Sequence, residues 1–154
     1  MLLARLAPGS SRDGEHFQRF SRGDPIAAPA PALGEISHGL RRAVERGSVG
    51  LGVMLAWWRQ IATGGLLDVL PLTGDAALVA GEVRALCPAP PPSRHRTRPK
   101  PERRVSWNVD IQIASTAWIH GHALRTGNQA DFLVIADALD RVAPGAPRLQ
   151  LLDP

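Results

Sequence analysis

The sequence has only one cysteine, Cys87, and no apolar run long enough to cross a membrane. A single thiol cannot form an internal disulfide, which is typical of proteins in a reducing cytoplasm. The longest apolar run, GLGVMLAWW, ends at Arg59 and falls well short of the ~20 residues that a membrane span requires. The opening MLLARLAP is too short and too weakly basic for a secretory signal. We therefore expect a cytoplasmic protein with no membrane segment.

The chain also lacks internal repeats and the composition of a disordered protein. It has 154 residues, of which 44% are hydrophobic and 21% are charged. This length and composition are typical of one globular domain with one sizeable core. We expect residues 1–154 to form a single domain.

Outside one segment the chain has no excess of basic residues, although its net charge is +4. Residues 94–104 hold six of the 18 basic residues and one of the 14 acidic ones, so 12 basic residues face 13 acidic ones elsewhere. The segment is either an arm that binds RNA phosphates or a solvated loop that aids solubility. The candidate RNA-binding residues are Arg94, Arg96, Arg98, Lys100, Arg103 and Arg104.

Apolar periodicity and turn residues predict strands that alternate with helices. We expect Gly47 to end one helix, Thr73 to cap another, and the proline- and arginine-rich residues 88–106 to form an extended excursion that contains no helix. The first 25 residues suggest short helices and turns. The predicted strands are 25–33, 66–72, 122–126 and 147–153, and the predicted helices are 33–47, 52–62, 75–86, 107–121 and 131–142. This order predicts an α/β sandwich with a mostly parallel sheet.

Three acidic residues follow predicted strands or stand at predicted helix starts, where the functional crevice of such a sheet lies. Glu35 follows the first strand, Asp110 opens a helix, and Asp131 follows residues 122–126. Clustered carboxylates repel one another, and a bound Mg²⁺ or Mn²⁺ ion offsets that cost. Each acid also has an ordinary alternative role, as a helix cap or as a charge near a helix N-terminus.

Three motifs in order resemble the PIN-domain ribonucleases, in particular the VapC-type toxins of bacterial toxin–antitoxin pairs. The motifs are a Gly-Glu pair that opens a helix, D-x-x-I-A-x-x-A on a later helix, and T-x-N-x-x-D-F after the next strand. The resemblance covers most of the chain apart from the basic excursion, and the last motif is the most specific. The matching residues are Gly34, Glu35, Asp110, Ile113, Ala114, Ala117, Thr126, Asn128, Asp131 and Phe132.

The resemblance implies a three-layer sandwich and an endoribonuclease that depends on Mg²⁺ or Mn²⁺. Glu35, Asp110 and Asp131 would bind the metal, directly or through water, and would be the catalytic acids. Thr126 and Asn128 would orient the loop, and Phe132 would anchor the segment behind it. The implied partners are an RNA substrate, a cognate antitoxin and a second copy of the chain.

One family feature is missing, which is an aspartate at the end of the first strand. Met1 aligns best with residues that follow this aspartate, so we expect the native chain to start upstream with that strand; the upstream codons test this. In the alternative alignment MLLA is the strand and Ala4 replaces the acid. The chain would then be a catalytically defective PIN remnant that binds an antitoxin or dimerises. A DNA-directed nuclease is a third interpretation.

Other candidate residues carry weaker signals. His120 and His122 are two residues apart, which does not suit a shared zinc ion on a helix. We expect one of Trp57 and Trp58 to be core and the other to be partly exposed through ordinary packing. The alternative is that the exposed tryptophan marks a dimer or antitoxin surface. Trp107 is the aromatic residue nearest the basic segment that could stack on a base. Cys87 has no neighbour in sequence that would activate its thiol.

Overall fold

The computed structural model describes residues 26–48, 50–65, 67–91 and 100–153, in two units, Met1–Leu70 and Pro71–Pro154. The predicted helical pieces of the first 25 residues lie outside the described residues, as do Arg94, Arg96 and Arg98. Among the described residues, no helix combines the length and the apolar character that a membrane span needs.

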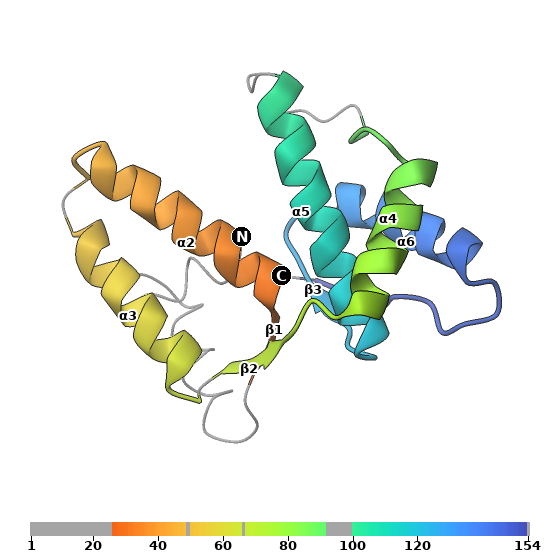
Figure 1. Ribbon diagram of the computed structural model, residues 1–154, viewed down its shortest axis with the longest axis horizontal. Coiled ribbons are helices and arrows are strands. Elements are labelled where there is room, and N and C mark those ends of the chain that lie inside the picture. The colour runs from red at the N-terminus through yellow and green to blue at the C-terminus, as the bar shows by residue number, and fades with distance from the viewer. Residues whose placement is uncertain (1–25, 49, 66, 92–99, 154) are drawn as a thin grey trace. The chain divides into compact units, whose positions relative to one another are not determined.

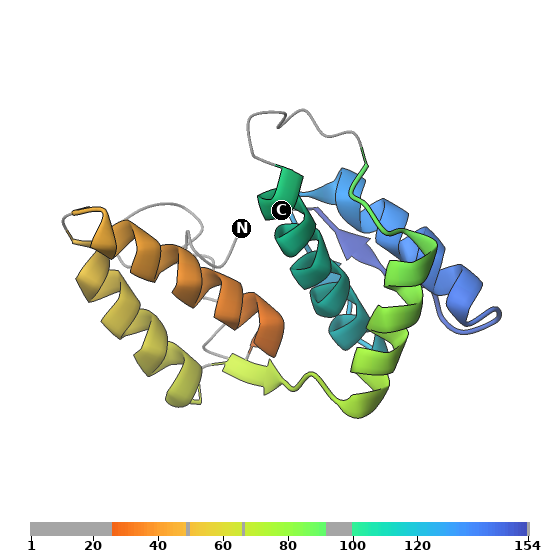
Figure 2. The same ribbon diagram turned by 45° about the horizontal axis from the view of Figure 1, so that its top comes forward.

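The first unit contains two parallel strands and a helical hairpin (Figure 1). Strand β1 (Ile26–Pro29) pairs with β2 (Leu67–Leu70), with Ile26 opposite Leu67. Helices α2 (Ala30–Glu45) and α3 (Leu51–Thr63) connect them and run antiparallel, as Figure 2 shows. A helical connection is what two parallel strands require.

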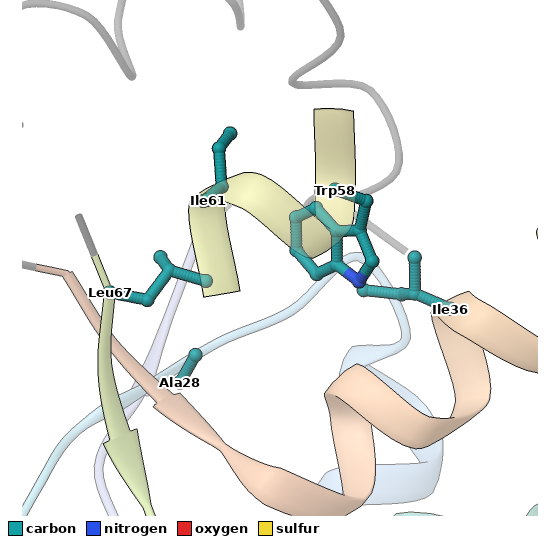
Figure 3. Close-up of a cluster of buried hydrophobic side chains, with 5 residues drawn as sticks. All are labelled: Ala28, Ile36, Trp58, Ile61 and Leu67. Carbon is teal, nitrogen blue, oxygen red and sulfur yellow. The ribbon is translucent and has the colours of Figure 1, made fainter. Parts of the chain in front are cut away.

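The core of the first unit forms where the strands meet the hairpin. All four elements contribute buried side chains to this cluster, which Figure 3 labels: Ala28, Ile36, Trp58, Ile61 and Leu67. Trp58 is 2% exposed, and Trp57 is partly buried against the same cluster, so the prediction for this pair is confirmed.

The second unit packs three helices together with a second parallel strand pair (Figure 1). Helices α4 (Gly74–Leu86), α5 (Lys100–Ile119) and α6 (Gln129–Val142) contact one another. Strand β3 (Leu124–Arg125) pairs with β4 (Leu151–Leu152). The core contains Val83, Trp107, Ile111, Ala114, Phe132, Ile135 and Leu139.

Local end signals behave as the sequence predicts. Thr73 Oγ1 accepts a hydrogen bond from Ala76 N over 3.2 Å and caps α4. Gly47 has a φ of 80°, and it follows the C-cap residue of α2. Its N–H donates to Val44 O, and Ser48 N donates to Ala43 O. These two bonds form a Schellman motif, which satisfies the last carbonyls of the helix.

Two helices begin earlier than predicted, because proline is tolerated in the first turn of a helix. The predicted strand 25–33 ends at Pro29, and α2 begins at Ala30 with Pro31 at its second position. Similarly, α5 begins at Lys100, with Pro101 second. Residues 100–106 are therefore helical, and the expectation that they continue an extended excursion is wrong.

Candidate functional site

The loop Thr126–Asn128 and the first turn of α6 form the best-defined polar site of the second unit. Thr126 follows β3, and its Oγ1 accepts a hydrogen bond from Asn128 N over 3.0 Å. Asn128 Nδ2 in turn donates to Asp131 Oδ2 over 2.8 Å. The three polar residues of the T-x-N-x-x-D motif therefore form one connected chain of hydrogen bonds.

Asp131 lies in the first turn of α6, where the helix dipole favours a negative charge. It is not the N-cap, because Asn128 holds that position. The Asn128 side chain makes no capping bond to the helix backbone and binds the Asp131 carboxylate instead. Phe132 beside it is 4% exposed, as expected for an anchor in the core. The local sequence therefore orients the carboxylate at the expense of an ordinary helix cap.

Asp110 lies inside helix α5 and does not open it. The helix begins ten residues earlier, at Lys100, so the prediction that Asp110 starts a helix is wrong. Its alternative roles as a cap or as a first-turn charge are excluded by the same observation. Asp110 is half-buried, and it is not without an interaction partner.

Glu35 lies beyond the first turn of α2, which has no acidic residue, so it is neither a cap nor a first-turn charge. It is half-buried and belongs to the first unit, whereas Asp110 and Asp131 belong to the second. Within the part of the chain that the structure describes, no three His, Cys, Asp or Glu side chains form a group that could hold a metal ion. The joint role of the three acids stays a prediction.

The basic segment is described only from Lys100 onward. Arg103 is half-buried and Arg104 is exposed, both in the first turns of α5. Trp107 is 1% exposed, and its Nε1 donates to Cys87 O over 2.8 Å. Base stacking needs an accessible ring face, so the one aromatic residue near the basic segment is not available to stack on RNA.

Two of the remaining candidates, His120 and Cys87, contact main-chain oxygens. His120 Nε2 lies 3.1 Å from Pro71 O, and His122 is exposed. Cys87 is buried, and its Sγ donates to Val83 O over 2.9 Å. Burial raises the pKa of the Cys87 thiol, against a smaller lowering by the Arg141 charge. A raised pKa reduces the thiolate fraction, as expected for a thiol without an activating partner.

Sequence reasoning missed Arg125, Gln129 and the C-terminal residues that they contact. Arg125 Nε donates to Asp153 O over 2.9 Å, and Gln129 Nε2 donates to Leu152 O over 3.0 Å. The Arg125 bond joins the carboxyl ends of β3 and β4, and the Gln129 bond ties the first residue of α6 to β4, both next to the Thr126 loop. The partners are more than 20 residues apart in sequence, so no local pattern indicates them.

No family model matches the chain, and no curated protein matches it. Among solved structures, it is similar to a chain of VapBC2 from Rickettsia felis, which was crystallised bound to a DNA fragment from its promoter. The TM-score is 0.56 at 15% sequence identity, over 99% of this chain and 92% of that chain. At this identity the likeness shows the fold alone, and it confirms the predicted α/β class with parallel strands.

Proposed function

We propose that the chain is a metal-dependent endoribonuclease of the PIN type and the toxin of a toxin–antitoxin pair. The observation that carries the proposal is the hydrogen-bonded chain Thr126–Asn128–Asp131 at the carboxyl end of β3. The fold shared with a chain of VapBC2 supports it. The position of Asp110 also supports the proposal, because an acid this far inside a helix does not act as a helix cap.

The donor atoms of the site suit a hard divalent cation such as Mg²⁺ or Mn²⁺. Asp131 Oδ2 accepts from Asn128, and no other hydrogen bond involves this carboxylate among the described residues. Asp131, with Asp110 and Glu35, would hold the ion. A bound ion would supply electrostatic stabilisation of charge on the phosphodiester. Asn128 would keep the Asp131 carboxylate in one orientation, and Thr126 would keep the loop in register.

The proposed partners are an RNA substrate, a cognate antitoxin and a second copy of the chain, in a reducing cytoplasm. The neighbouring VapBC2 structure supports the protein partner, because it is a complex. The RNA target depends on surface shape and accessible bases.

Cleavage of a labelled RNA with Mg²⁺ or Mn²⁺ tests the proposal. We expect Asp131→Asn, Asp110→Asn and Glu35→Gln each to lower the rate by at least about 100-fold, since each removes a charged ligand. The matched control is Asp75→Asn, which changes an exposed acid in the first turn of α4. Equal rates for the Asp131 and Asp75 variants would contradict the assignment. Antitoxin binding without cleavage would favour the binding-module interpretation.

A further inference from the structure

Arg125 is a fixed cation beside the candidate site. It is the last residue of β3 and directly precedes Thr126. In β3 the buried residue is Leu124, and Arg125 is exposed on the other face. Alternation along a strand therefore sends this side chain away from the core, at the edge where the Thr126 loop begins.

The Arg125 side chain is held by a neutral acceptor. Its Nε donates to the main-chain oxygen of Asp153, at the carboxyl end of the neighbouring strand β4. Gln129 Nε2 holds the preceding carbonyl, that of Leu152, so the acceptor strand is itself tied to the loop. These bonds restrict the guanidinium before any ligand arrives, and so lower the entropic cost of binding.

The positive charge of Arg125 is not neutralised within the described part of the chain. The ion pairs formed there are those of Arg41 with Glu45 and of Arg148 with Asp137 and Asp140. The Asp153 carboxylate lies toward Gln129, with Oδ1 3.5 Å from Nε2, and forms no ion pair with Arg125 among these residues. Arg125 therefore keeps its charge and its terminal N–H groups for an anionic ligand.

We propose that Arg125 binds a backbone phosphate of the RNA substrate and positions it against the loop Thr126–Asn128 and the Asp131 carboxylate; this rests on the proposed nuclease function. Guanidinium groups bind phosphate oxygens through two parallel hydrogen bonds, and they keep their charge at any physiological pH. A cation next to carboxylates also offsets the repulsion between those acids and the phosphates. The contact is to the backbone, so it contributes affinity and register and no base specificity.

Binding of a fluorescent single-stranded RNA, measured with EDTA so that metal-dependent cleavage is suppressed, tests this role. We expect Arg125→Gln to weaken binding by about tenfold, the loss typical of one charge-assisted hydrogen bond. The slope of log affinity against log salt should fall by roughly 0.7, which corresponds to one phosphate contact on a single strand. Arg125→Lys should keep the slope and lose part of the affinity, because an ammonium cannot bind a phosphate bidentately.

The matched control is Arg84→Gln, which removes the same charge from an exposed position in the last turn of α4. If the Arg125 and Arg84 variants bind RNA with the same affinity and salt slope, the phosphate contact is excluded. Urea unfolding tests the alternative that Arg125 only stabilises β4. In that case Arg125→Gln would lower the stability of the protein without changing the salt slope of RNA binding. Cleavage by the Arg84 variant is scored separately. If the nuclease proposal fails, no form of the chain cleaves RNA. If only the phosphate contact is excluded, the Arg84 variant still cleaves RNA, so the two failures are distinguishable.

Discussion

At the scale of single residues, Asn128 has an unusual role for a helix N-cap. Asparagine is a preferred residue at this position because its side chain usually accepts a backbone N–H of the first turn. Here its amide donates to the carboxylate of Asp131 and leaves the backbone uncapped by a side chain. A stabilising contact is thus replaced by one that orients an acid, which is the pattern expected of a functional position.

Replacing Asn128 should lower RNA cleavage while leaving the stability of the protein nearly unchanged. We expect Asn128→Ala to lower RNA cleavage by about 10- to 100-fold, the effect typical of removing a residue that orients a metal ligand. The free energy of unfolding should change by no more than about 1 kcal/mol, because Asn128 is exposed and loses one hydrogen bond. The measurements are a cleavage rate and a urea unfolding curve.

The chain contains one other asparagine, Asn108, which is half-buried in α5 and serves as the control. Asn108→Ala should retain cleavage. Equal activity of the two variants would show that the Asn128–Asp131 hydrogen bond has no role in catalysis.

At the scale of elements, a glycine turn directs the chain from α5 into β3. Gly121 has a φ of 71°, its N–H donates to Trp118 O, and His122 N donates to Ala117 O over 2.9 Å. This is a second Schellman motif, and it ends the long helix, whose last residue, Ile119, lies two residues before Gly121. The turn sets where β3 starts, and therefore where Arg125 and the Thr126 loop lie.

A pair of glycine substitutions tests this turn. Gly121→Ala should destabilise the protein by about 1–2 kcal/mol, because a side chain disfavours the left-handed backbone conformation. Gly81→Ala should instead stabilise it by about 0.4–1 kcal/mol, since Gly81 is exposed inside α4 and an added Cβ meets nothing within 4 Å. Urea unfolding compares the two. Destabilisation of similar size in both would contradict the explanation from backbone conformation.

At the scale of the whole molecule, each unit has its own apolar core, and the candidate site depends on the core of the second. Ile135 and Leu139 in α6 are 0% and 1% exposed, so the helix that carries Asp131 is held by deeply buried side chains. An exposed loop can keep a defined geometry when the elements on both sides are packed in this way.

Shortening a buried side chain of α6 should destabilise the helix that carries the site. We expect Ile135→Ala to cost about 2–5 kcal/mol, because a buried side chain is replaced by a cavity. Leu133, two residues away on the same helix, is 49% exposed. Leu133→Ala should therefore change stability by less than about 0.5 kcal/mol. Tryptophan fluorescence during urea unfolding measures both. A large cost for Leu133→Ala would show instead that its exposed side chain is packed against a partner.

The sequence by itself determined the features that depend on neighbours a few residues away. Periodic apolar residues, the Thr73 cap and the Gly47 turn predicted α3, α4 and the end of α2, because these signals act through contacts within about one turn. Asp131 was also identified locally, as an acid that follows a predicted strand, whereas Thr126 and Asn128 were identified only through the resemblance to the PIN-domain motif.

Only the tertiary structure decided the features that depend on distant partners. Two proline-containing segments became first turns of helices, and as a result Asp110 lies well inside α5. Trp107 is buried in the core, and its indole N–H donates to the carbonyl of Cys87, 20 residues away. Arg125 finds the carbonyl of Asp153 at a separation of 28 residues. Such pairs form when packed elements bring their backbones together, and a local pattern contains no information on which carbonyl will lie there.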